Sequence, residues 1–196
     1  MTLVTDPHDG KSIGIRSPNV SADIVLISHD HFDHNHFRVV LGRKTKVYKR
    51  EMDTTINGIR IQSMSVFHDD AGGTKRGENL LFKFTFDGIS YCHLGDLGHL
   101  LDEKVTEKIG SIDLLFVPVG NVFTIGPKDA WKVINTLKPK VAIPMHYRVG
   151  GLSLSIKPID PFLEGAPTDS VIKVGNEIEF ESEDLPEELE IWVFTM

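Results

Sequence analysis

Residues 22–36, with the sequence ADIVLISHDHFDHNH, join a short apolar run to a cluster of four histidines. The run Ile24–Ile27 is wholly apolar, which is typical of a strand that is covered on both faces. The histidines therefore follow the carboxyl end of a buried strand, where we expect a loop. Imidazole and carboxylate groups suit zinc, iron and manganese, and alternate residues of a compact turn can face one side. The stretch predicts a metal site at the end of a strand.

Three further candidate ligands follow short predicted strands elsewhere in the chain. They are His68, Asp96 and His146. Sites in open α/β sheets form outside the carboxyl ends of strands, so side chains from separate strand ends can converge there. The alternative is a His-rich surface tract that binds metal adventitiously or not at all. The position of all three residues at strand ends favours one shared site.

These motifs resemble those of the metallo-β-lactamase superfamily, and more narrowly its small Zn-dependent hydrolase branch, which is related to ascorbate-6-phosphate lactonase. The resemblance covers nearly the whole chain and is most specific in the His-x-His-x-Asp-His pattern at 29–34. Its other parts are Asp6-Pro7, His68, Gly95-Asp96, Pro118-Val119-Gly120 and Ile143-Pro144-Met145-His146-Tyr147. It implies an α/β fold, the αββα sandwich, as one hydrolase domain over residues 1–196.

The start of the chain departs from this resemblance. Relatives usually have about two strands before the Asp-Pro motif, whereas only Thr2–Thr5 precede it here. We therefore expect a sandwich that lacks the family's first strands, either because the N-terminus is truncated or because the fold tolerates the loss. An unpaired N-terminal strand predicts a homo-oligomer or an exposed strand edge.

Carried over residue by residue, the resemblance implies two metal subsites bridged by Asp96. The implied ligands are His29, His31 and His68 in the first subsite, and Asp33, His34 and His146 in the second. The expected cofactor is a pair of divalent ions, zinc first, with manganese or iron as alternatives. Two such ions with two carboxylates keep a net charge of about +2, which favours a bound hydroxide as the nucleophile. Asp33 and Asp96 are thus the expected catalytic residues.

Two residues near the motifs have open roles. Asp6 matches the first acidic motif of the superfamily, so the resemblance implies that it orients a metal ligand and does not bind metal itself. The alternative is that Asp6 only caps a helix or forms a turn. His93 competes with His68 for the first subsite because Tyr91 and His93 share one face of a predicted strand and lie near Asp96, and we favour His68. The remaining histidines have no motif position and are expected to be partly exposed: His8, His36 and His99.

Two features concern the substrate. Lys75 and Arg76 lie in a Gly-rich loop that could bring two cations and backbone N–H groups to an anion, or that could be a solvated surface loop. Tyr147, next to an implied ligand, could hydrogen-bond a substrate oxygen or pack on Trp131. These residues favour an anionic small molecule as substrate.

Composition limits the class of partner and the location. The 196 residues contain 21 Lys+Arg and 28 Asp+Glu, a net charge of −7, whereas proteins that coat nucleic acid or anionic membranes need a basic face. No apolar run approaches the ~18 residues of a membrane span. The single cysteine, Cys92, and the lack of signal-peptide features after Met1 lead us to expect a cytoplasmic protein.

The remaining elements are predicted from local signals. Asn57-Gly58 and Asp87-Gly88 predict the turns of two β-hairpins. Helices are expected at 102–109 and at 128–137, the second introduced by Pro127. Other strands are expected at 3–5, 113–117, 141–144, 171–174, 177–180 and 190–194.

The sequence thus predicts a metal-dependent hydrolase that uses a metal-bridging hydroxide on a small anionic ester, lactone or phosphoester. The superfamily spans many substrate classes, so the resemblance leaves the substrate open. Two alternatives remain. The first is a non-catalytic metal-binding protein. The second is a metal-dependent nuclease, which the net charge and the lack of room for a clamp domain disfavour.

Overall fold

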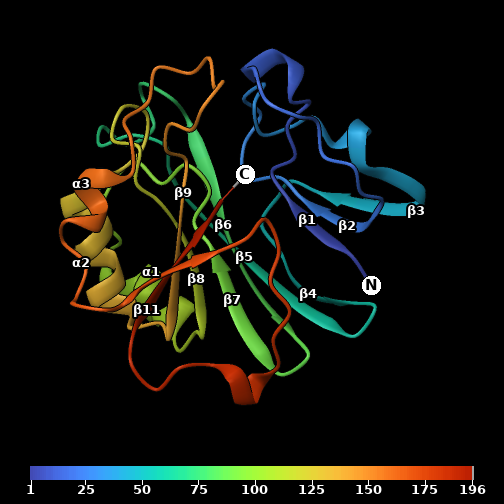
Figure 1. Cartoon of the computed structure of the whole chain (residues 1–196). Helices are drawn as coiled ribbons and strands as arrows, with labels where there is room; N and C mark the ends of the chain where they lie inside the picture. The colour runs from blue at the N-terminus through green and yellow to red at the C-terminus, as the bar shows by residue number, and fades with distance from the viewer. Residues whose placement is uncertain (196) are drawn as a thin grey trace.

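Two β-sheets pack face to face in the computed structural model, which describes residues 1–195 (Figure 1). The smaller sheet has the strand order β1-β2-β3, and the larger has the order β10-β11-β9-β8-β7-β6-β5-β4. Helices cover the face of the larger sheet that is turned away from the smaller one (Figure 1). Within residues 1–195 these are α1 (Glu103–Ile109), α2 (Pro127–Leu137) and α3 (Asp160–Leu163).

The smaller sheet is built around a buried central strand. Ile24 and Leu26 pack against the larger sheet, while Val25 packs on the opposite side against the 3₁₀ segment η2 (Phe37–Val40). Burial on both faces explains why this strand is continuously apolar. The three parallel strands are β1 (Leu3–Thr5), β2 (Ala22–Leu26) and β3 (Leu41–Tyr48).

The two outer strands of this sheet differ in how well the sequence predicts them. Strand β3 was not expected, because Arg43, Lys44 and Lys46 interrupt any apolar alternation, and its pairing with β2 stabilises it instead. Strand β1 forms as expected and, among residues 1–195, is the outermost strand of this sheet beside β2. Association into a homo-oligomer through this strand stays a prediction.

The first half of the larger sheet consists of two hairpins at the predicted dipeptides. Asn57 and Gly58 have φ of 50° and 87°, and Asp87 and Gly88 have φ of 48° and 81°, the left-handed backbone that tight hairpin turns require. The antiparallel strands are β4 (Asp53–Ile56), β5 (Ile59–Phe67), β6 (Glu78–Phe86) and β7 (Ile89–His93).

The second half of the larger sheet is parallel and carries the helices. Asp102 accepts a hydrogen bond from the Val105 N–H (2.8 Å) and so caps α1, and Pro127 begins α2. Among residues 1–195, no helix has both the length and the apolar character needed to cross a membrane. The parallel strands are β8 (Leu114–Pro118), β9 (Val141–Met145), β10 (Val171–Val174) and β11 (Glu190–Phe194).

One predicted strand is wrong and one short helix was not expected. Residues 177–180 form no strand, although Phe180 packs edge-on against Trp192 with ring centroids 5.1 Å apart. Their apolar pattern therefore reflects packing on the sheet face rather than backbone pairing. Helix α3 has only four residues and includes Pro161, so it leaves no periodic signal in the sequence.

Strand direction brings the candidate ligands to one edge. Strand β6 is antiparallel to both β5 and β7, and β8 and β9 are parallel to β7, so β5, β7, β8 and β9 all run the same way. His68, Asp96 and His146 follow the carboxyl ends of β5, β7 and β9. The histidine-rich loop 28–36 follows β2 in the facing sheet, so the site forms between the two sheets.

Candidate metal centre

Seven side chains converge at this edge, as the motif spacing predicts. Within the described residues, three groups of side chains have potential ligand atoms within 4.8 Å of one another. Two of these groups are the predicted ones, and the third shares one histidine with each of them. The predicted groups are His29, His31 and His68, and Asp33, His34 and His146; the third is Asp6, His29 and His34.

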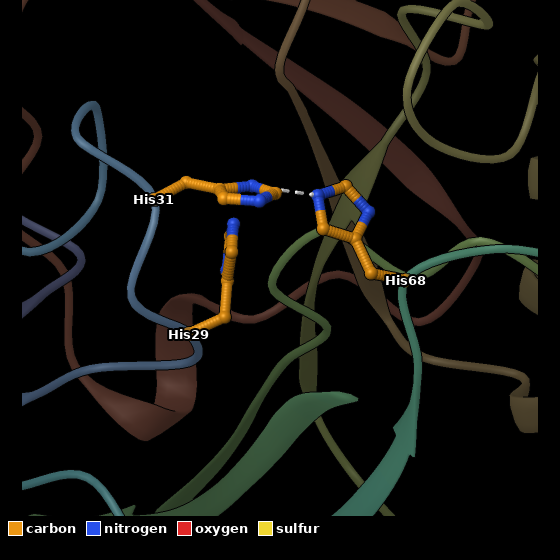
Figure 2. Close-up of side chains that lie close together, drawn as sticks. All are labelled: His29, His31 and His68. Carbon is orange, nitrogen blue, oxygen red and sulfur yellow. Dashed lines mark hydrogen bonds between the residues drawn. The ribbon is translucent and has the colours of Figure 1, made fainter. Parts of the chain in front are cut away.

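The first group consists of imidazoles alone (Figure 2). His68 Nε2 lies 3.2 Å from His31 Nδ1, and the His29 ring centroid lies 4.6 Å and 4.7 Å from those of His31 and His68. His29 Nε2 is buried and has no hydrogen-bond partner among residues 1–195. An unpaired buried polar atom costs about 1–3 kcal/mol, unless a cation takes its lone pair. This donor set fits a divalent transition metal such as zinc.

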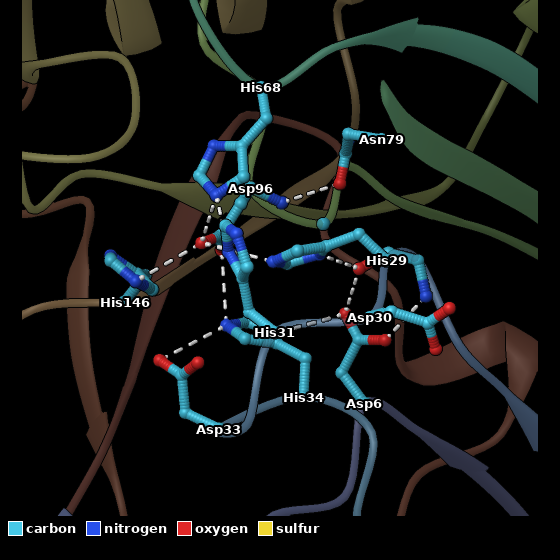
Figure 3. Close-up of polar contacts among 12 residues, drawn as sticks. Asp6, His29, Asp30, His31, Asp33, His34, His68, Asn79, Asp96 and His146 are labelled. Carbon is cyan, nitrogen blue, oxygen red and sulfur yellow. Dashed lines mark hydrogen bonds and ion pairs between the residues drawn. The ribbon is translucent and has the colours of Figure 1, made fainter. Parts of the chain in front are cut away.

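Asp96 lies between the two groups (Figure 3). Its Oδ2 is 3.3 Å from His68 Nε2 and 3.4 Å from His146 Nε2, and its Oδ1 is 3.4 Å from His34 Nε2. His29 Nε2 is slightly farther from Oδ2, at 3.8 Å. The carboxylate therefore reaches nitrogens of both groups, as a bridging ligand must.

The second group mixes a carboxylate with two imidazoles. Asp33 Oδ2 lies 3.6 Å from His34 Nε2, and the His34 and His146 rings stack with centroids 5.9 Å apart. His146 has φ of 54°, a left-handed backbone that is uncommon outside glycine and that clusters at functional sites. A carboxylate and imidazoles again suit a divalent ion.

Asp6 orients two of the histidines from behind. Its Oδ1 accepts the Ser28 N–H (2.6 Å), and its Oδ2 accepts the Ser28 hydroxyl (2.6 Å) and lies 3.3 Å from His34 Nδ1. Because the Ser28 hydroxyl donates its hydrogen to Asp6, Ser28 Oγ can only accept a hydrogen bond from His29, so the Nδ1–H of His29 donates to it (2.8 Å). His29 Nε2 then keeps a free lone pair toward the centre. In metal sites a carboxylate commonly fixes the tautomer of a ligating histidine in this way, so the contact fits the candidate role of these histidines.

Asn79 positions Asp96, and sequence reasoning missed it. The Asn79 side chain is fully buried, accepts the Asp96 N–H (2.9 Å) and donates to the Leu94 carbonyl (2.8 Å). Gly95 allows this contact, because a Cβ there would lie 2.3 Å from Asn79 Oδ1. No local pattern marks Asn79, since its partners lie 15 and 17 residues away.

Two glycines let ligand-bearing loops approach closely. A Cβ at Gly98 would lie 2.2 Å from the Asp69 backbone nitrogen and 2.3 Å from the His68 carbonyl carbon. A Cβ at Gly120 would lie 2.0 Å from the His146 backbone oxygen. Side chains at these positions would clash with the backbone at His68, Asp69 and His146, so both candidate ligands depend on these glycines.

Comparison with known proteins establishes the family. Residues 1–146 match the family model of a β-lactamase superfamily domain. The chain belongs to the β-lactamase superfamily. The resemblance stated from the motifs is thereby confirmed.

Relatives in the superfamily cover most of the chain. A protein from Pelotomaculum thermopropionicum described as a metal-dependent hydrolase is 30% identical over 67% of this chain and 70% of its own. Another so described, from Bacillus licheniformis, is 26% identical over 91% of each chain.

Solved structures confirm the fold class. A Thermotoga maritima protein assigned to the Zn-dependent hydrolases of the metallo-β-lactamase superfamily has a TM-score of 0.80 and 41% identity, over 98% of this chain and 88% of that one. A Parabacteroides distasonis protein has a TM-score of 0.61 and 21% identity over 74% of each chain, which shows the shared fold alone.

Three side chains of the candidate metal centre have pKa values far from their usual ones. Burial would raise the pKa of Asp96, but His34 and His146 together with the other imidazoles hold this pKa at about 2. Burial would lower the pKa of His34, but Asp96 and Asp6 outweigh it and raise this pKa to about 10. Burial, and then the neighbouring His34, lowers the pKa of His29 to about 3. A metal ion at the second group must therefore displace a proton from His34.

These pKa shifts predict how the stability of the metal-free protein depends on pH. An unfolded histidine titrates near pH ~6.5. Between pH 6.5 and 3 the unfolded chain binds a proton that folded His29 does not, so stability falls as the pH drops. Between pH 6.5 and 10 folded His34 keeps a proton that the unfolded chain has lost, so stability falls as the pH rises. The maximum is expected near pH 6.5, with slopes of up to about 1.4 kcal/mol per pH unit for each proton.

Urea unfolding in EDTA at pH 5, 6.5 and 8.5 measures this profile. The His34→Gln variant should lose the decline on the alkaline side while keeping the decline on the acid side. A free energy of unfolding that rises steadily to pH 8.5 in the parent protein would contradict the assignment of the proton to His34.

The other residues considered from the sequence lie outside the two predicted ligand groups. His93 is buried but belongs to none of the groups that could hold a metal within residues 1–195, and its Nδ1 accepts the Gly95 N–H (3.1 Å). The Tyr147 hydroxyl donates to the Phe194 carbonyl (3.3 Å). The remaining histidines are partly exposed, as expected: His8, His36 and His99.

The backbone N–H groups of the Gly-rich loop are not free to bind an anion from outside, because they already donate to the Asp69 carboxylate. The Asp69 carboxylate accepts N–H groups of the loop at 2.7–2.9 Å, and this holds its pKa at about 2 although burial acts to raise it. The Lys75 ammonium is exposed and pairs with Asp70 at 2.8 Å. The four donors are the backbone N–H groups of Ala71, Gly73, Lys75 and Arg76.

Two cavities open on the cluster and share Asp33, Asp96 and His146 in their walls. One, of about 320 Å³, includes Arg76, whose guanidinium lies 5.4 Å above the Phe123 ring. The other, of about 290 Å³, lies on the side of the second group. The centre can thus be approached from two sides.

Proposed function

We propose that this chain is a metal-dependent hydrolase that holds two divalent metal ions, zinc first, and acts on a small anionic ester, lactone or phosphoester. The observation that carries the proposal is the position of Asp96, within 3.8 Å of nitrogens from both groups. The description of its relatives as metal-dependent hydrolases supports it.

The residues around the centre have distinct roles in this proposal. When bound, the two ions supply a water that ionises near pH ~7 instead of ~16, together with a Lewis acid for the substrate oxygen. Asp33 and Asp96 would offset part of the positive charge, and Asp96 would hold its carboxylate between the histidines of both groups. Asp6 holds His34 and, through Ser28, His29 in the orientation that presents their Nε2 atoms.

Arg76 is the proposed contact for an anionic group of the substrate. It is the only Lys or Arg lining either cavity beside the cluster within residues 1–195. Its ring contact with Phe123 and a hydrogen bond to the Val122 carbonyl (3.5 Å) hold it at the cavity wall. A held guanidinium binds carboxylate or phosphate with both orientation and charge.

The proposal is tested by metal analysis of protein purified without an affinity tag that binds metal, followed by a substrate panel. The panel comprises phosphodiesters, lactones, carboxylic esters and thioesters. We expect two equivalents of a divalent metal, and hydrolysis in at least one class that stops on chelation. Two bound equivalents without hydrolysis of any class would instead support a non-catalytic metal-binding protein. Salt-sensitive RNA cleavage would support a nuclease.

Arg76→Gln is expected to raise KM for an anionic substrate roughly ten- to a hundredfold with little change in kcat. The reason is that a hydrogen bond to a charged group contributes about 1.5–3 kcal/mol. Lys75→Gln is the matched control, because its ammonium is exposed and paired with Asp70. Steady-state kinetics of both variants make the comparison, and equal KM values for Arg76→Gln and the parent would refute the role of Arg76.

A further inference from the structure

The cavity on the side of the second group has an apolar wall. Its volume is about 290 Å³, and it extends from Asp33, His34 and His146. Tyr147 also lines this cavity, and its hydroxyl donates a hydrogen bond to the Phe194 carbonyl. The apolar part of the lining consists mainly of Ile13, Ile15, Val149, Leu152, Leu154 and Ile156.

Two loops that approach each other closely build this wall. The Ser153 N–H donates to the Ile13 carbonyl (2.9 Å), which joins the early loop to the loop after β9 (Figure 1, blue and orange). Gly14 and Gly151 meet at this contact with φ of 81° and 85°, and a Cβ at Gly14 would lie 2.4 Å from the Gly151 oxygen. The approach is specific, because neither position accommodates a side chain without strain.

The later loop alternates between the cavity and solvent. Leu152, Leu154 and Ile156 line the cavity, whereas Ser153 and Ser155 are exposed. The apolar side chains of this surface loop therefore all lie on the side that faces the cavity, and the serines lie on the side that faces solvent. Apolar lining with a few polar groups at one end is typical of a site for a small organic ligand.

Together the two cavities describe the shape of the ligand. Leu154, Asp33 and His146 line both, so a molecule at the cluster can extend into the apolar cavity on one side and toward Arg76 on the other. We infer that the substrate is an amphiphile, with an anionic group on the Arg76 side and an alkyl or aryl group in the apolar cavity. This inference rests on the proposed hydrolase function and deepens it by naming the substrate class.

The cavity volume limits the size of the apolar group. An apolar cavity of about 150 Å³ binds benzene, so about 290 Å³ suits a single ring or a short alkyl chain. Long acyl chains of membrane lipids would extend beyond it. The expected ligand is therefore a small amphiphile.

A series of straight-chain carboxylates tests the inference. Acetate, butanoate, hexanoate, octanoate and decanoate are titrated by calorimetry into the metal-loaded protein as purified. Each added methylene should tighten binding by up to about fourfold until the cavity is full, and longer chains should bind no better. A Kd that is independent of chain length would overturn the inference.

Variants locate the effect in the cavity. Ile15→Trp should fill the space, so that affinity stops rising at a shorter chain, and Leu152→Asn should flatten the dependence on chain length. Both residues are half-buried, and thermal unfolding checks that each variant is folded. Ile172→Trp, on the exposed face of β10, is the matched control and should behave as the parent. A series unchanged in both cavity variants would also overturn the inference.

This outcome and that of the proposed function are distinguishable. Hydrolysis of short esters together with a flat carboxylate series would remove the apolar site and keep the hydrolase. A chain-length dependence that the cavity variants abolish, without hydrolysis of any substrate class, would keep the amphiphile site and remove the hydrolase function.

Discussion

Asp96→Asn is expected to lower kcat/KM on any substrate found in the panel by at least two to three orders of magnitude, and to reduce bound metal from two equivalents toward one. The amide keeps the shape of the side chain but loses the charge that faces four imidazoles. Removing a hydrogen-bonding partner of a metal ligand already costs 10–100-fold, so loss of the proposed bridging ligand should cost more. Elemental analysis and steady-state kinetics on the same preparation measure both effects.

Asp30→Asn is the matched control for this substitution. Asp30 lies in the same histidine-rich loop, but its carboxylate is exposed and pairs with Lys49 at 3.2 Å. Metal content and activity should stay at parental values. Full activity of Asp96→Asn at unchanged metal content would exclude a bridging carboxylate.

Gly98→Ala is expected to destabilise the metal-free protein by about 1–3 kcal/mol or more and to weaken metal binding at the first group. The added Cβ would meet the backbone at His68 and Asp69, which cannot move as the end of a flexible side chain can. Because the Gly98 N–H also donates to the Phe67 carbonyl (3.0 Å), the two loops are fixed to each other. Urea unfolding in EDTA and metal titration measure the two effects.

Gly175→Ala provides the control for a glycine substitution without a clash. Its Cβ would lie 3.7 Å from the nearest atom outside its chain neighbours, an ordinary contact. Stability and metal affinity should then stay close to those of the parent. If Gly98→Ala were as stable as Gly175→Ala with parental metal affinity, His68 would not depend on this loop contact.

The candidate ligands could be predicted because four of them lie in one motif and the others follow recognisable strands. The hairpins were equally accessible, since Asn57-Gly58 and Asp87-Gly88 act within a few residues. Strand β3 was not, because its polar sequence is stabilised by a neighbour and not by its own pattern. The strand predicted at 177–180 was wrong for the opposite reason. Its alternating apolar side chains pack on the protein, but its backbone pairs with no strand among residues 1–195.

The residues that support the ligands could not be found from sequence. Asn79 and Gly98 act on Asp96 and His68, each 17 or more residues away, and neither changes the local pattern. Contacts that the sequence does not show also decide how the Gly-rich loop could bind an anion. Asp69 takes the backbone donors, and only Arg76 of the two cations reaches a cavity.

The position of Asp6 couples the outermost strand β1 of the smaller sheet to the chemistry of the centre. Asp6 follows directly after β1, and its N–H donates to the Leu26 carbonyl (2.9 Å). Edge strands are usually among the easiest parts of a fold to open. Here, fraying of β1 would release the carboxylate that orients His34. By linkage, a ligand that requires the oriented histidines therefore holds down the first strand, and the N-terminal edge becomes part of the cooperative unit.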